Sequence, residues 1–205
     1  MAAWSGHFGS DGDFSEKALI QKSNTHLSNE LGNLVQRTLS MTHKNCEGKI
    51  PMLSHAFSNE DQSLLIQAQN ILGQAQEHMD NQELHKYVDA LWSVIWAANK
   101  YVDEQAPWTL RKTDTERMNV VLYTLMETLR YIGIMAQPLI PDAAKGLLDM
   151  LSVPADQRMF SHMKSAFALE AAECKYHGFN KVNRIRLKNT LEDIVYKSNQ
   201  KEMNR

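Results

Sequence analysis

The chain has 205 residues, a formal net charge of −2 and a hydrophobic fraction of 43%, which suits a soluble globular protein of one domain, or one domain with an appendage. This charge excludes a chain that is basic overall, so any surface that binds nucleic acid must be local. Cys46 and Cys174 are too few for a disulfide framework, and no apolar run approaches the roughly 18 residues of a membrane span.

The N-terminus carries no visible targeting signal. Residues 1–14 have neither a basic segment followed by an apolar one nor the arginines of a transit peptide. We therefore expect a cytoplasmic protein, with a mitochondrial location as the alternative and no membrane contact.

The first half of the chain predicts a loop followed by helices. Residues 1–12 are rich in Gly and Ser, and capping-box patterns follow at residues 13–16 and 58–61. Gly48 and Pro51 predict a loop over residues 42–57. Three helices are expected: from Asp13 to about Leu39, from Ser58 to about His78, and from about Asn81 until Pro107 stops it.

The second half continues the helical pattern. Residues 113–116 cap a fourth helix with an apolar stripe from Val121 to Met135, and Pro138 and Pro141 separate it from a helix over residues 143–151. Further helices are expected from about Ala155 and Asn180. Because no segment alternates with period two, the fold class is all-α, an antiparallel helical bundle over residues 13–160 with a basic helical tail over residues 161–205.

No residue pattern predicts catalysis or metal binding. The histidines and cysteines do not fall into a zinc-binding spacing, no Gly-x-Ser-x-Gly sequence occurs, and no Gly-rich loop precedes a helix in a nucleotide-binding setting. We expect no catalytic residue, no metal and no cofactor in this chain.

The first helix carries a polar ladder. Asn29, Asn33 and Arg37 follow one another at intervals of four residues, so they share one face, while Leu31 and Leu34 point towards a core. Two amides and a guanidinium can hydrogen-bond the edge and the phosphate of an unstacked nucleotide. The same spacing also suits a solvated helix face, and spacing alone does not separate the two interpretations.

The tryptophans fall into two groups. Trp92 and Trp96 are four residues apart on the third helix and are expected in the core or between helices. Trp108 follows Pro107 just past that helix, before the basic pair Arg111 and Lys112. A Trp on a rigid turn at one end of a bundle is a platform on which a base can stack. The alternative is that Trp108 closes the end of the core.

Several ordered segments resemble one family. Residues 8–15, 27–37 and 44–51 closely resemble the start of the C-terminal anticodon-binding domain of methionyl-tRNA synthetase, and residues 99–112 resemble its second signature. Residues 127–133 and 137–144 resemble its later helices. The resemblance covers about residues 8–160 and is stronger to the bacterial and organellar branch than to the eukaryotic cytosolic one.

The resemblance implies a helical bundle that recognises the anticodon CAU of methionine tRNA. Trp108 would stack on the first anticodon base, cytosine; Asn33 and Arg37 would hydrogen-bond its edge or phosphate, with Asn29 supporting them. Candidate phosphate contacts are Arg111 and Lys112 and, in the basic C-terminal stretch, Lys181, Arg184, Arg186 and Lys188. For that stretch a solvated terminal helix is the alternative.

The catalytic motifs of the same family are absent from the chain. Neither a His-Ile-Gly-His sequence nor a Lys-Met-Ser-Lys-Ser loop occurs, and the zinc-knuckle insertion is missing. The resemblance therefore implies that ATP binding belongs to a separate catalytic domain and that this chain does not charge tRNA alone. Two alternatives remain: an inert helical adaptor that docks a protein partner without tRNA, and a chain with the family's ligase activity, against which the missing motifs argue.

Overall fold

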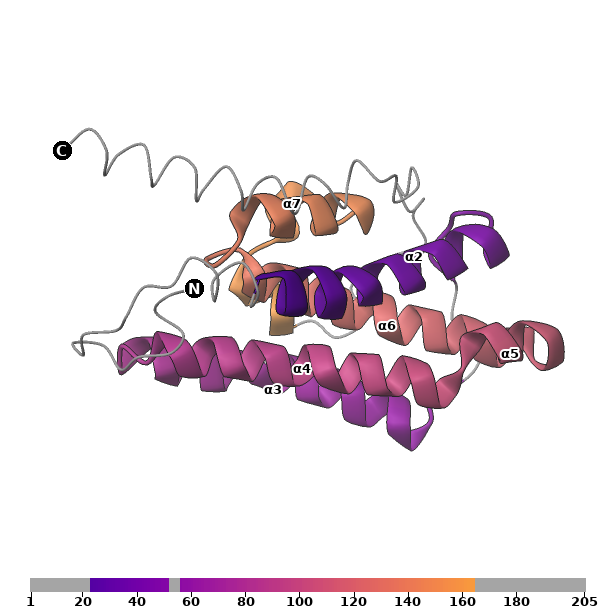
Figure 1. The fold of residues 1–205 in the computed structure, drawn as a ribbon, viewed down its shortest axis with the longest axis horizontal. Helices are drawn as coiled ribbons and strands as arrows, with labels where there is room; N and C mark the ends of the chain where they lie inside the picture. The colour runs from indigo at the N-terminus through magenta and orange to yellow at the C-terminus, as the bar shows by residue number, and fades with distance from the viewer. Residues whose placement is uncertain (1–22, 52–55, 165–205) are drawn as a thin grey trace.

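The computed structural model describes residues 23–51 and 56–164, and within them every element is helical (Figure 1). The expected loop over residues 1–12, the start of the first helix and the helix from Asn180 lie outside these ranges. No helix of the described part is both long enough and apolar enough to span a membrane. The all-α expectation is confirmed.

Three long helices form the body of the bundle: α3 (Asn59–Asp80), α4 (Leu84–Gln105) and α6 (Thr115–Ala136). The first helical segment consists of a π-helix, η2 (Ser23–Leu31), continued by α2 (Gly32–Asn45). Two shorter helices, α5 (Pro107–Thr113) and α7 (Pro141–Met150), contact α6 near its two ends. In Figure 1, α6 lies between α3 and α4 on one side and α2 and α7 on the other.

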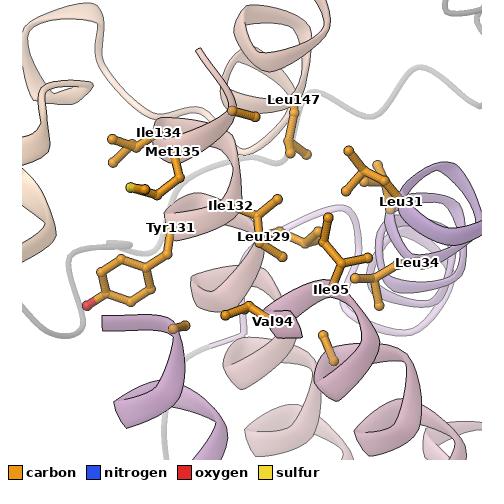
Figure 2. Packing of buried hydrophobic residues seen from close by; sticks show 14 of the residues in the cluster. Leu31, Leu34, Val94, Ile95, Leu129, Tyr131, Ile132, Ile134, Met135 and Leu147 are labelled. Carbon is orange, nitrogen blue, oxygen red and sulfur yellow. The ribbon is translucent and has the colours of Figure 1, made fainter. Parts of the chain in front are cut away.

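Helix α6 is the central element of the core. Every residue from Val120 to Ala136 is buried, as a helix must be when neighbours cover its whole circumference. Figure 2 shows Leu129 and Ile132 of α6 among Leu34 of α2, Ile95 of α4 and other apolar side chains. The bundle is therefore built outward from one helix.

A buried ion pair lies on the same helix. Arg130 donates to the Glu127 carboxylate from Nε at 3.0 Å and from Nη2 at 2.6 Å, and both side chains are almost completely buried. Nη1 of Arg130 also donates to the backbone oxygen of His162 at 3.3 Å. This third bond joins the segment after α7 to the core, and it satisfies part of the hydrogen-bonding capacity that a buried guanidinium needs.

The helices begin where the sequence predicted wherever the capping residues are close together in the chain. Ser58 and Asp61 form the expected capping box, and Pro141 occupies the first turn of α7. The cap of α6 is Asp114, within the expected range 113–116, and its carboxylate accepts from the backbone N–H of Arg117 at 2.9 Å. The third helix begins at Leu84, because Gln82 takes a left-handed φ of 60° just before it.

Two expectations about helix extent were wrong. The first helix continues to Asn45, past the expected end at Leu39, because buried Thr42 still packs on α6 and donates to the Thr38 carbonyl at 3.1 Å. The expected helix from Ala155 is replaced, within the described residues, by the 3₁₀ turns Ala155–Gln157 and Phe160–Lys164. Here Arg158 donates to the Val153 carbonyl at 3.0 Å and fixes a non-α backbone.

Candidate functional site

Arg37 of α2 and Trp108 of α5 meet at one end of the bundle. The guanidinium carbon of Arg37 lies 5.1 Å from the centroid of the Trp108 ring, within the range of a cation–π contact. Trp108 is 41% exposed, so it does not close the core. The exposed aromatic ring and the cation beside it form one surface.

Asp103 near the end of α4 completes this cluster. Its Oδ1 accepts from Arg37 Nη2 at 2.5 Å, and the side chains of Arg37 and Asp103 are 36% and 64% exposed. An exposed ion pair of this kind contributes only about 0–1 kcal/mol. Arg37 is thus oriented by Asp103 but can exchange that partner for another at low cost.

The direction of Trp108 is set by a sharp junction between two helices. Ala106 ends α4 and begins α5 with φ 42° and ψ 59°, a left-handed conformation that costs a residue with a Cβ about 1–2 kcal/mol. Buried Pro107 follows at the first helical position, where its missing N–H costs nothing. Trp108 consequently lies in the first turn of a short helix, and the expectation of a simple turn was wrong.

A network of polar side chains beneath the protein surface stabilises the junction at Ala106. Arg117 at the start of α6 donates from Nη2 to Gln105 Oε1 at 2.6 Å and to Asp61 Oδ1 at 2.8 Å. Asp61 is completely buried and also accepts from the Tyr101 hydroxyl and from the backbone N–H of Ser58, the latter at 2.8 Å. The network therefore ties α3, α4 and α6 together beside residue 106.

The charge state of Asp61 follows from these contacts. Burial by itself would raise the pKa of Asp61, but hydrogen bonds from Arg117, Tyr101 and Ser58 and the positive charge of Arg117 outweigh it, so the pKa is lowered. The pKa of Tyr101 is raised, first by burial and then by its bond to the carboxylate. Asp61 is thus ionised and Tyr101 neutral around neutral pH.

The polar ladder is only partly regular. Asn33 and Arg37 lie one α-helical turn apart on α2, and both are half-buried. Asn29 lies in the π-helical segment, where a turn takes more than four residues, so it is offset from the line through the other two. It is exposed. The structure brings Arg37 to Trp108 and places Asn33 on the adjoining turn, with Asn29 further along the bundle.

The two tryptophans of α4 differ from expectation. Trp92 is buried, and the ring of His26 meets it edge-on at 5.7 Å between centroids. Trp96 was expected in the core or between helices; it is 50% exposed, which excludes the core. Four residues advance an α-helix by slightly more than one turn, which rotates Trp96 past the edge of the buried face.

The basic candidates divide by location. Arg111 and Lys112 are exposed in the last turn of α5, on the same short helix as Trp108. Lys181, Arg184, Arg186 and Lys188 lie outside the described residues. Arg111 and Lys112 therefore add positive charge close to the Arg37–Trp108 surface.

Sequence patterns missed Asp103 and the network around Asp61. Arg37 and Asp103 are 66 residues apart in the chain, and Arg117 and Asp61 are 56 apart, so no local spacing could pair them.

Among the described residues, no group of three His, Cys, Asp or Glu side chains could hold a metal ion. An open cavity of about 420 Å³ follows α7 and is lined by Asp149, Arg158 and residues 152–155.

Comparison with known proteins gives a consistent result. The family model described as the anticodon binding domain of methionyl tRNA ligase matches residues 50–184. Methionine–tRNA ligase of Brucella suis is 51% identical over 154 residues, which cover 75% of this chain and 30% of that protein. The Rickettsia felis ligase is 42% identical over 171 residues, covering 80% and 32%.

A solved structure matches at the level of the fold as well. The apo form of Mycobacterium tuberculosis methionyl-tRNA synthetase superposes with a TM-score of 0.76 and 36% sequence identity. The match covers 81% of this chain and 34% of that one. The chain thus spans about a third of the length of the proteins that it resembles.

Proposed function

Because the chain belongs to the family of anticodon-binding domains of methionyl-tRNA ligases, we propose that it binds the anticodon loop of methionine tRNA and selects the CAU triplet. The chain spans only 30% of the Brucella suis ligase. Activation of methionine with ATP and transfer to tRNA would accordingly be the work of a catalytic domain, which this bundle supplies with the correct tRNA. The Arg37–Trp108 pair is the observation that carries the proposal.

Trp108 acts as the platform for the first anticodon base, cytosine. Its ring is exposed, and its backbone is fixed by Pro107 and by the junction at Ala106, so little conformational freedom is lost on binding. Stacking of a base on an aromatic side chain contributes about 1–3 kcal/mol. This contact accepts any base, so the choice of cytosine must come from polar neighbours.

Arg37 and Asn33 supply that choice. A guanidinium only donates, so Arg37 suits the N3 and O2 acceptors of cytosine, while the carbonyl oxygen of Asn33 suits the N4 amine. Uracil keeps the O2 acceptor but presents an N3–H donor, which would face the guanidinium donor unpaired, and an O4 acceptor, to which Asn33 could donate only by turning its amide. An unmade bond to a desolvated group costs about 1–3 kcal/mol, which corresponds to roughly a tenfold preference for cytosine.

Asp103 holds Arg37 in the free protein and releases it on binding. Their exposed ion pair costs little to break, and the Arg37 guanidinium already lies over one face of the ring on which the base would stack. Asn29, which lies further along the first helical segment, would contact the next part of the anticodon loop. Arg111 and Lys112 would neutralise phosphates near Trp108, and the basic residues 181–188 would add attraction that does not depend on sequence.

A binding titration with labelled anticodon stem-loops tests the proposal. At constant salt, fluorescence anisotropy should show a CAU loop binding about ten times more tightly than a UAU loop. Trp108→Ala should abolish most of the binding to both loops, whereas Ile66→Ala, which removes another exposed apolar side chain, on α3, should change nothing. Equal affinity for the two loops would refute the proposal and favour a helical adaptor without tRNA.

A further inference from the structure

We propose that Trp96 is a second stacking platform, which takes another unpaired base of the same RNA loop. The inference rests on the proposed function and extends it along the bundle. Its starting point is the exposure of Trp96, at 50% the more exposed of the two surface tryptophans in the described residues. Tryptophan is enriched at binding interfaces because its large apolar ring carries a polar N–H.

Contacts between α4 and the first helical segment show at which level along the bundle axis Trp96 lies. His26 meets Trp92, the backbone oxygen of Glu30 accepts from Asn99 Nδ2 at 3.3 Å, and Arg37 pairs with Asp103. The residue numbers rise together on both segments, so the two run parallel. Trp96 therefore lies between the levels of the first two contacts, beside the part of the first segment that carries exposed Asn29.

The same helical face continues from Trp96 to the Arg37–Trp108 surface. Residues 92, 96, 99 and 103 follow the spacing of one α-helical stripe, and residues 92, 99 and 103 of it contact the first segment. Trp96 and Asp103 are two turns apart, about 10.5 Å along the axis. Stacked bases are spaced about 3.4 Å apart, so this length suits two or three consecutive nucleotides.

Two exposed indoles consequently stand at the two ends of the polar ladder, Trp108 beside Arg37 and Trp96 at the level of Asn29. Lys100, one turn from Trp96 on α4, is 76% exposed, and its Nζ lies 3.6 Å from Oε1 of Glu104, an exposed ion pair that costs little to exchange for a phosphate. Aromatic rings that alternate with donors and cations along one face are the arrangement by which proteins hold single-stranded RNA. A purely apolar protein partner would have no use for the amides and the lysine between the rings.

The test compares Trp96→Ala, Trp96→Phe and Ile66→Ala in the full chain by anisotropy titration with the CAU stem-loop. We expect Trp96→Ala to bind about ten times more weakly, Trp96→Phe to recover most of the affinity, and Ile66→Ala to bind like the parent protein. Repeating the titration with one abasic site at each loop position identifies the base. At one position other than the first anticodon base, the abasic loop should make the parent protein and Trp96→Ala bind alike.

Three results would overturn the inference. They are unchanged affinity of Trp96→Ala, a loss that is the same for every abasic loop, and a loss that only the abasic first base removes. If the parent protein binds no loop or does not distinguish CAU from UAU, the proposed function itself fails, and the Trp96 platform fails with it. Preserved CAU selectivity together with full binding by Trp96→Ala overturns the second platform alone.

Discussion

Replacing Asp61 with Asn should destabilise the bundle strongly, because this carboxylate is the centre of the network under the α4–α5 junction. The substitution keeps the shape and removes the charge, and the amide nitrogen that replaces either carboxylate oxygen cannot accept the hydrogen bond that Arg117 donates there. Breaking a fully buried ion pair costs about 3–5 kcal/mol. Arg117 is 22% exposed and can turn partly to water, so the lower end, about 3 kcal/mol, is expected.

Thermal unfolding followed by circular dichroism measures this loss. For a chain of this size, about 3 kcal/mol should lower Tm by roughly 6–12 °C near neutral pH. Asp89→Asn, which neutralises an exposed carboxylate on α4, is the matched control and should leave Tm nearly unchanged.

The parent protein and Asp61→Asn should respond differently to acid. The folded-state pKa of Asp61 is lowered from the ordinary value of 3.8, so the stabilisation is complete above that value and is lost as the pH falls through the lower folded-state pKa. The Tm difference between the parent protein and Asp61→Asn should therefore be largest near neutral pH and shrink in acid. Equal Tm values near neutral pH, or a gap that persists unchanged in acid, would refute the account of this network.

Three further substitutions test the packing and the surface separately. Gly133→Ala should lower Tm, because the added Cβ would lie 2.9 Å from a methyl carbon of Leu148 in the α6–α7 contact, and overpacking costs about 1–3 kcal/mol. Gly73→Ala, which adds a methyl group in open space on α3, should raise Tm. The opposite order of the two Tm values would contradict the packing of α6 on α7. Asp103→Asn should bind the CAU loop roughly two to five times more tightly in the anisotropy titration, because it removes a carboxylate that competes with the RNA for Arg37. Weaker binding would show instead that the ion pair positions Arg37.

Local signals in the sequence predicted those parts of the fold that depend on local chemistry. The capping box at Ser58 and Asp61 needs only residues three apart, and Pro141 and Pro107 act through their own fixed φ and missing N–H. The same Pro107 that ends α4 also begins α5. That second role depends on the left-handed backbone of Ala106, which no residue preference of alanine predicts.

Features that depend on tertiary contacts could not be predicted in this way. Asp61 was predicted as a cap, but its bonds to Tyr101 and Arg117 join residues 40 and 56 positions away. The periodicity of α4 predicted Trp96 in the core or between helices, yet half of its side chain is exposed, since the pattern marks a face of the helix but not where the neighbouring helix stops covering it. The π-helical start of the first segment, which displaces Asn29, has no local sequence signal.

For the candidate site, family resemblance contributed what spacing could not. It paired the ladder with Trp108, and the structure has Arg37 against that ring. The binding roles of Asn29, Asn33, Arg37 and Trp108 remain predictions, as do those of the basic residues 181–188.

Coupling between Trp108 and the first anticodon base tests the central claim most directly. Four affinities are needed: the parent protein and Trp108→Ala, each with the CAU stem-loop and with the same loop lacking its first base. If the ring and the base stack on one another, removing either should make the other nearly irrelevant, with a coupling free energy of about 1–3 kcal/mol. Additive losses, with a coupling near zero, would contradict the claim that Trp108 holds the first base of the anticodon.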